Sequence, residues 1–262
     1  YAEGLGFLIH PKNVASYEDG EVRILDRRIY PMKLEYVTCR DYSEVVQAIR
    51  DMVTQSMGPW LASALGMVLA ASTAKNLTVK EATEFLKKAA KELGHARPTT
   101  SVFQVKHMKR ILDVSLKALD AGKNIESETL DFVYSILEER YREDQTIGRL
   151  AASLLPDKVR LLTQCFAETY IGYTLLEARN MGKEVSLVCP ETRPFLQGAR
   201  LTASMAREMD IPVTVVTDNM PAFMMSQGLI DVFACAADVV TLDGYAVNKV
   251  GTLQLAIAAH YH

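Results

Sequence analysis

The stretch that decides the fold is Val185-Ser186-Leu187-Val188-Cys189-Pro190-Glu191-Thr192-Arg193-Pro194-Phe195-Leu196-Gln197-Gly198-Ala199-Arg200-Leu201-Thr202-Ala203. Its first five residues form a short apolar run rich in β-branched side chains, which is typical of a buried parallel strand. The residues after Gly198 begin an alanine-rich helical pattern. Ligands gather where parallel strands hand over to helices, so the polar side chains of residues 191–197 are candidates for binding a small polar ligand. A helix-capping loop with one surface arginine is the alternative.

Strand-then-helix pairs fill the rest of the chain after Pro156-Asp157. The strand candidates are residues 159–163, 185–189, 213–217, 232–235 and 239–242, and the expected helices are about residues 168–181, 198–208, 219–227 and 246–260. This alternation predicts an α/β fold in which residues 151–262 form a doubly wound, Rossmann-like parallel sheet. No Gly-x-Gly-x-x-Gly motif follows the first strand, so we expect no dinucleotide and no other cofactor. An open sheet would normally return for another strand after the last helix, so we also expect the C-terminal end of this domain to be incomplete.

The part before residue 150 has a different pattern. Asp19-Gly20 marks a turn between two β-like runs, and residues 33–36 alternate as a third strand should, until Val37. Helices are expected along residues 45–53, 60–71, 102–119 and 128–142, and also from a capping box at Thr78-Val79-Lys80-Glu81 to about Gly94. Residues 1–150 are therefore predicted to form a small N-terminal sheet with a helical domain.

The composition is that of an ordinary globular protein. Of the 262 residues, 49% are hydrophobic and 23% are charged, which allows a sizeable core. The formal net charge of −3 provides no positive field for nucleic acid, so no such partner is expected. There is no apolar run of about 18 or more residues and no signal-peptide pattern at the start, so we expect no membrane partner and a cytoplasmic protein.

Four widely spaced cysteines, Cys39, Cys165, Cys189 and Cys235, include no Cys-x-x-Cys pair. We therefore expect neither disulfides nor a metal site, and three of the four lie in or at the end of apolar runs that favour burial. Cys165 is better placed to meet a substrate, because it lies just beyond the first strand of the α/β half. A buried, unreactive thiol is the alternative for Cys165 as well.

Two later segments carry further candidate groups. Asp238 lies among apolar residues, where loss of solvation would favour the protonated form that a general acid needs. A turn aspartate between two strands is the alternative. Asn248 and Lys249 lie near the start of the last predicted helix, where backbone amides suit phosphate or hydroxyl groups, although capping and a surface lysine explain them too. Phe223-Met224-Met225 either line an apolar subsite or belong to the core.

Several motifs follow one another in the order of a known family. They are Leu25-Asp26, Leu34-Glu35-Tyr36-Val37, Ala48-Ile49-Arg50-Asp51-Met52-Val53, Arg97-Pro98-Thr99, Glu191 to Ala203, Thr217-Asp218-Asn219 and Asn248-Lys249-Val250-Gly251-Thr252. Together they resemble the methylthioribose-1-phosphate isomerase family, which is related to ribose-1,5-bisphosphate isomerase and to the regulatory subunits of the eukaryotic initiation factor 2 exchange factor. The match spans most of the chain.

The resemblance implies an aldose–ketose isomerase that acts on a sugar 1-phosphate, and a homodimer. By the family pattern Asp238 would be the acid and Cys165 its catalytic partner. Arg97, Gln197, Asn248 and Lys249 match the family positions that hold the phosphate and the sugar hydroxyls.

Some neighbouring residues depart from the family pattern. The family usually has His-Cys-Asn-Thr-Gly where this chain has Gln164-Cys165-Phe166-Ala167-Glu168, and Gly-Ala-Asp-Arg where it has Ala236-Ala237-Asp238-Val239. The Arg-Gly-Ala-Pro loop is replaced by Gln55-Ser56-Met57-Gly58-Pro59. We interpret the chain as a divergent paralogue, such as a 5-deoxyribose-1-phosphate isomerase, that acts on a 5-deoxy or 5-methylthio pentose 1-phosphate. A ribose-1,5-bisphosphate isomerase is an alternative. A non-catalytic regulatory or nucleotide-binding protein is the alternative from another class.

Overall fold

A computed structural model describes residues 2–98 and 101–262, which form two compact units. One unit is Pro11–Arg140, and the other joins the N-terminal residues up to His10 with Tyr141–His262. The predicted domain boundary at residue 150 falls inside a long helix, α6 (Ile125–Leu154).

The first unit contains a three-stranded antiparallel sheet in the order β1 (Ala15–Glu18), β2 (Glu21–Leu25), β3 (Tyr36–Cys39). The Asp19-Gly20 turn joins β1 to β2 as predicted, with positive φ at both residues. The third strand was expected at residues 33–36 but begins at Tyr36, which pairs with Leu25. Leu34 is 57% exposed, so the alternation there does not mark a buried face.

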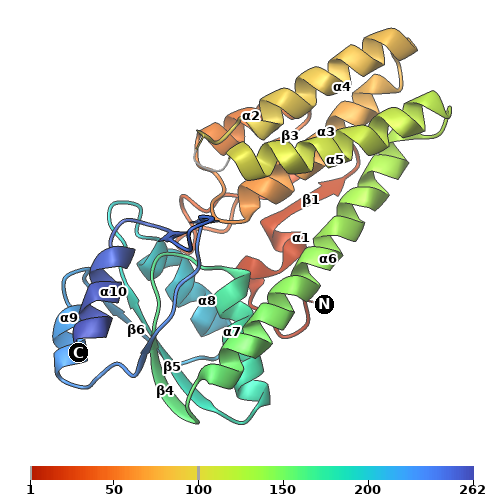
Figure 1. Cartoon of the computed structure of the whole chain (residues 1–262). Coiled ribbons are helices and arrows are strands. Elements are labelled where there is room, and N and C mark those ends of the chain that lie inside the picture. The colour runs from red at the N-terminus through yellow and green to blue at the C-terminus, as the bar shows by residue number, and fades with distance from the viewer. Residues whose placement is uncertain (1, 99–100) are drawn as a thin grey trace. The chain divides into compact units, whose positions relative to one another are not determined.

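The helices of this unit lie beside that sheet in Figure 1. They are α1 (Pro11–Val14), α2 (Tyr42–Arg50), α3 (Gly58–Ala74), α4 (Val79–Gly94), α5 (Ser101–Asp120) and the first part of α6. Helix α3 is buried along almost its whole length, as its uniformly apolar sequence predicts, because α2, α4, α5 and the sheet all pack on it.

Helix α6 is longer than the predicted helix of residues 128–142. No proline occurs between Arg142 and Pro156, and the one glycine there does not end the helix, which continues to Leu154. Gly148 lies within it, where a Cβ atom would come 2.4 Å from the Cβ of Tyr173. The absence of a side chain at Gly148 therefore allows α6 to approach α7 (Thr169–Asn180) closely.

The second unit is built on a parallel sheet in the order β6-β5-β4-β7. The strands are β4 (Lys158–Leu162), β5 (Glu184–Pro190), β6 (Val213–Val216) and β7 (Val232–Phe233). The intervening helices are α7, a π-helical turn (Gly198–Thr202) that continues into α8 (Ala203–Glu208), and α9 (Pro221–Ser226). The strand order reverses between β4 and β7, which is the doubly wound, Rossmann-like arrangement.

Helices cover both faces of this sheet. Figure 1 shows α7 and α8 on one face, and α9 and α10 (Thr252–Tyr261) on the other. On the second face the side chains of Leu162, Val188 and Val216 pack against Met225 of α9 and Leu255 of α10. A short 3-10 turn near the N-terminus (Phe7–Ile9) joins the first face, where the Leu8 amide donates to a Glu208 carboxylate oxygen at 2.9 Å.

Residues 239–242 were expected to form a fifth strand of this sheet, and that prediction is wrong. Val239–Val240 forms β8 and pairs antiparallel with β9 (Ala246–Val247) in a separate two-stranded hairpin around Gly244. The last helix accordingly starts at Thr252 and not at residue 246. Two adjacent valines look the same in sequence whether they lie in an exposed hairpin or in a buried strand. The sequence therefore did not distinguish these two structures.

Among the described residues, none of the helices combines the length and apolar character required to cross a bilayer.

Candidate active site

The candidate residues of the second unit follow the carboxyl ends of its strands. Cys165 comes after β4, the 191–197 loop after β5, Asp218 after β6 and Asp238 after β7. Because all four strands are parallel, these segments begin at the same edge of the sheet. Strands β4 and β7 flank the point where the strand order reverses, which is where open α/β sheets bind ligands.

Cys165 is held by its backbone in a left-handed conformation, with φ of 64°. Its N–H donates to the hydroxyl oxygen of Thr192 at 3.3 Å, and its carbonyl oxygen accepts a hydrogen bond from the hydroxyl of Thr202. The residue is partly exposed, unlike the buried Cys39 and Cys189.

The other cysteines differ from Cys165. Cys39 and Cys189 are buried, and burial raises the pKa of their thiols to about 11 and about 12. Cys235 is exposed, contrary to the burial expected for a cysteine at the end of an apolar run, because β7 ends at Phe233 before reaching it. Cys39 and Cys189 therefore fit the unreactive role predicted for core thiols.

Gln197 lies at the end of the loop after β5 and is 4% exposed. The next residue, Gly198, starts the π-helical turn, and a Cβ atom there would lie 1.8 Å from the Pro190 carbonyl oxygen. The missing side chain at Gly198 therefore allows the π-helical turn to pass close to the end of β5. Arg193, by contrast, is exposed.

Asn248 and Lys249 precede α10, and Lys249 and Val250 contact segments from other strand ends. The Asn248 amide donates to the Thr252 hydroxyl at 3.2 Å, and the Lys249 ammonium lies 5.7 Å from the ring centroid of Phe195. In addition, the side-chain amide of Gln164 donates to the Val250 carbonyl at 3.0 Å. These contacts join the 248–250 segment to the ends of β4 and β5.

The apolar surroundings expected for Asp238 are not found. Asp238 is exposed, and Val239 and Val240 beside it are 48% and 69% exposed. The reason is that these valines belong to the two-stranded hairpin and not to the helix-covered sheet. The Asp238 N–H donates to the Val247 carbonyl at 2.8 Å, so Asp238 lies next to the strand that leads to Asn248.

The remaining predicted residues lie elsewhere. Arg97 is partly buried between α4 and α5, in the Pro11–Arg140 unit, and Thr99 of its motif is outside the described residues. Met225 is buried in the sheet core and Met224 packs against that core, so both are core residues, whereas Phe223 is exposed.

Gln164, Thr202 and Asp218 were not among the residues predicted for the site, and Thr192 was included only as one of the polar residues of the 191–197 loop. Three of them lay inside quoted motifs, but nothing in a local pattern indicates that a threonine hydroxyl bonds the backbone of a cysteine 27 residues away.

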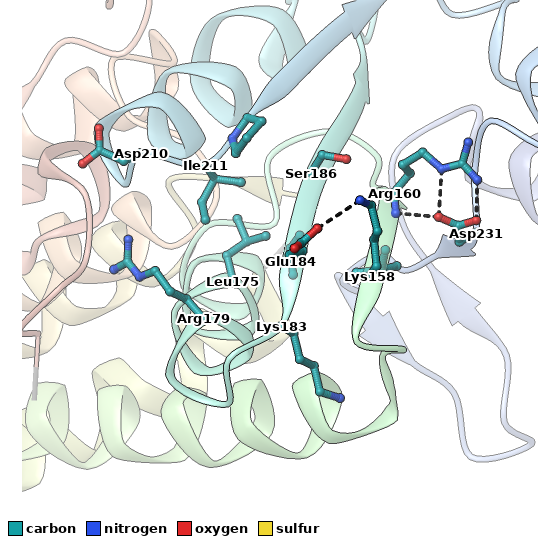
Figure 2. Close-up of a pocket in the computed structure, with 13 residues that line it drawn as sticks. Lys158, Arg160, Leu175, Arg179, Lys183, Glu184, Ser186, Asp210, Ile211 and Asp231 are labelled. Carbon is teal, nitrogen blue, oxygen red and sulfur yellow. Dashed lines mark hydrogen bonds and ion pairs between the residues drawn. The ribbon is translucent and has the colours of Figure 1, made fainter.

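A hollow of about 720 Å³ lies at the opposite, amino ends of the strands (Figure 2). Lys158, Glu184, Arg160 and Asp231 help to line it, but their charges are already paired: Lys158 with Glu184 at 3.1 Å and Arg160 with Asp231 at 2.6 Å. None of the predicted site residues lines this hollow. Within the parts of the chain that the structure describes, no group of three or more His, Cys, Asp or Glu side chains is arranged to hold a metal ion.

Comparison with known proteins gives the family. Residues 53–262 match the model of the initiation factor 2 subunit family. The methylthioribose-1-phosphate isomerase of Desulforamulus reducens is 31% identical over 258 residues, which cover 95% of this chain and 75% of the relative. The enzyme of the same name from Anaeromyxobacter sp. is 35% identical over 263 residues, with 96% and 74% covered.

Two solved structures share the fold. The 5-methylthioribose 1-phosphate isomerase of Pyrococcus horikoshii OT3 has a TM-score of 0.83 at 28% identity, covering 96% of this chain and 74% of the other. The translation initiation factor eIF-2B subunit delta from A. fulgidus has a TM-score of 0.81 at 30% identity, covering 95% and 74%. These two names belong to different functional classes, so it is the sequence relatives that favour an enzyme over the non-catalytic alternative. The chain therefore belongs to the initiation factor 2 subunit family and, within it, to the methylthioribose-1-phosphate isomerase family, whose members indicate that it is an isomerase.

Proposed function

We propose that the protein is an aldose–ketose isomerase that converts a 5-substituted ribose 1-phosphate to the corresponding ribulose 1-phosphate. The substrate is 5-methylthioribose 1-phosphate or 5-deoxyribose 1-phosphate. The methylthio group follows the name of the relatives, and the 5-deoxy sugar is its smaller apolar counterpart.

The observation that carries this proposal is the position of Cys165 and Asp238. They follow β4 and β7, the neighbouring parallel strands on either side of the reversal in strand order. A small phosphorylated sugar at the usual ligand position of such a sheet would lie near both segments.

The substrate sets the chemistry that these groups must perform. A phosphate on the anomeric oxygen prevents the sugar from opening to a free aldehyde. The enzyme therefore needs an acid that protonates the ring oxygen and a group that handles the hydrogen leaving C2. In the product C2 is a ketone, C1 has gained hydrogen and keeps its phosphate, and the ring oxygen has become a hydroxyl. We assign the acid role to Asp238 and the second role to Cys165.

The binding roles follow the family motif. We assign Gln197, Asn248, Lys249 and Arg97 to the phosphate and the sugar hydroxyls. The contact between Lys249 and Phe195 supports grouping Lys249 with Gln197, because Phe195 lies in the same loop as Gln197.

Turnover of both pentose 1-phosphates by single variants tests the catalytic roles. Cys165→Ser and Asp238→Asn should each lower kcat by about 100-fold or more, the usual contribution of a positioned acid or base. Asp243→Asn is the matched control, because Asp243 is an exposed carboxylate in the same hairpin region. Unchanged kcat in either site variant would refute the role assigned to that residue.

Ribose-1,5-bisphosphate isomerisation is the second candidate activity. The residues beside Cys165, Gln164 before it and Phe166 after it, differ from the family pattern, so the group carried at C5 of the sugar has to be tested directly. In competition kinetics we expect the 5-methylthio or 5-deoxy sugar to be preferred. A clear preference for ribose 1,5-bisphosphate would overturn the proposed substrate.

We also propose that the enzyme acts as a homodimer in the cytoplasm and binds a small sugar phosphate, with no nucleic acid or membrane partner. Sedimentation equilibrium should give twice the chain mass. A monomer at micromolar concentration would contradict the dimer.

A further inference from the structure

Asp218 joins the ends of two neighbouring strands. It lies just beyond β6, and Thr192 and Arg193 lie just beyond β5. One carboxylate oxygen of Asp218 accepts the Thr192 N–H and the other accepts the Arg193 N–H, each at 2.8 Å. Hydrogen bonds to an ionised acceptor are stronger than neutral ones, so this pair fixes the start of the 191–197 loop.

Thr192 is held in an uncommon conformation by these bonds. It is 1% exposed and has φ of 62°, a left-handed value that a β-branched residue rarely adopts. Such a conformation persists only where its surroundings determine it. The Thr192 hydroxyl donates to the Pro190 carbonyl at 3.2 Å, which leaves its oxygen free to accept from the Cys165 N–H.

Cys165 is thus fixed through both of its backbone polar groups. Its N–H is bound by Thr192 and its carbonyl by Thr202, and its own φ of 64° is also left-handed. Because a fixed backbone fixes the Cα–Cβ bond, the two threonine hydroxyls set the point from which the thiol projects.

We propose that Asp218 is a positioning residue for Cys165, acting through Thr192. Asp218 orients Thr192, the Thr192 hydroxyl orients the backbone of Cys165, and the thiol is held ready for the substrate. The inference rests on the proposed catalytic role of Cys165, and it adds residues whose function is to hold that thiol.

Thiol alkylation in the absence of substrate gives the first test. Iodoacetamide is reacted with the intact chain, and peptide mass spectrometry follows the four cysteines separately. Thr192→Val keeps the shape of the side chain and the amides that Asp218 binds, but removes the hydroxyl. We expect Cys165 in Thr192→Val and in Asp218→Ala to react about threefold faster, or more, because the released backbone exposes the thiol.

Kinetics give the second test. In Thr192→Val kcat should fall about 100-fold with KM little changed, because the thiol is misplaced while the ligand-binding groups keep their positions. Thr192→Ser, which keeps a hydroxyl at this position, should have nearly the wild-type rate of Cys165 alkylation and nearly the wild-type kcat. Asp231→Asn is the matched control, because Asp231 pairs with Arg160 at the opposite end of the sheet, and this variant should behave as wild type.

The outcomes separate this inference from the proposed function. If wild type does not turn over pentose 1-phosphates but Asp218→Ala and Thr192→Val still speed alkylation of Cys165, the positioning role stands and the substrate assignment fails. If Cys165→Ser abolishes turnover while folded Thr192→Val keeps wild-type alkylation and kcat, the positioning role is overturned. Should Asp218→Ala fail to fold, Thr192→Val decides the question alone.

Discussion

At Gly198 the backbone leaves no room for a side chain, because a Cβ atom would lie 1.8 Å from the Pro190 carbonyl oxygen. Gly198→Ala must therefore displace the π-helical turn and should lower the free energy of unfolding by about 3 kcal/mol, the upper range for overpacking. Gly122→Ala is the control, since Gly122 has φ of 63° with no atom near its Cβ position, and should cost about 1 kcal/mol from conformation alone. Urea denaturation measures both. Equal losses would contradict the steric explanation.

At the scale of single elements, α4 begins with the capping box that the sequence predicted. The Glu81 N–H donates to the Thr78 hydroxyl oxygen at 3.4 Å, and the Thr78 N–H donates to the Glu81 carboxylate at 3.1 Å. Thr78→Ala should lower the free energy of unfolding by about 1 kcal/mol, because it leaves an end amide without its acceptor. Thr83→Ala, one turn further along the helix, should change it by less than about 0.5 kcal/mol. Chemical denaturation of both variants is the check, and a similar loss in the two would argue against the cap.

A second prediction concerns the packing of α3, α5 and α6 around His107. Burial, together with the charges of Arg140, Arg110 and Lys106, lowers the pKa of His107 to about 4. The His107 and Trp60 rings are nearly perpendicular, with centroids 5.8 Å apart. The unfolded chain takes up a proton near pH 6.5 and the folded chain only near pH 4. The stability contribution of neutral His107 is therefore complete above pH 6.5 and is lost as the pH falls from 6.5 to 4.

His107→Gln should remove this part of the pH dependence. Trp60 is the only tryptophan in the chain and reports on the unfolding of this region by its fluorescence. Urea titrations between pH 4 and 7 should show a shallower decline of stability for the variant than for wild type. Identical slopes would show that His107 is not the responsible group.

At the scale of the whole molecule, each compact unit contains one deeply buried thiol, Cys39 in β3 and Cys189 in β5. Burial raises the pKa of both thiols, so neither should react with iodoacetamide in native buffer. Because each unit has its own core, we expect the two thiols to become reactive at different urea concentrations. Pulse alkylation with peptide mass spectrometry measures both. A single shared transition would show that the units unfold together.

Much of the fold follows from local patterns. The β-branched runs predicted β4, β5 and β6 within about one residue, and the apolar run after Gly58 predicted α3. Errors arose where the local pattern was ambiguous. The valines at 239–240 have the composition of a core strand but pair only with a short partner. After Arg142 the chain has no proline before Pro156, and Gly148 alone does not end the helix.

The candidate site was predictable to a smaller extent. Gly198 and the strand-end position of Cys165 follow from the order of strand, loop and helix along the chain. The exposure of Asp238 could not be predicted in this way. Burial depends on which elements cover a segment and not on the character of its neighbours in sequence. Whether Arg97 binds the same ligand as Gln197 stays a prediction.

By itself the sequence determined the alternation of strands and helices after Pro156, the start of α4 and the family, because these depend on residue type and on spacing over a few residues. Only the tertiary structure decided that β7 lies beside β4, and that Asp218, Thr192 and Cys165 form one hydrogen-bonded series. Those contacts join residues from different strand ends, and their geometry is set by sheet packing that no short stretch of sequence contains.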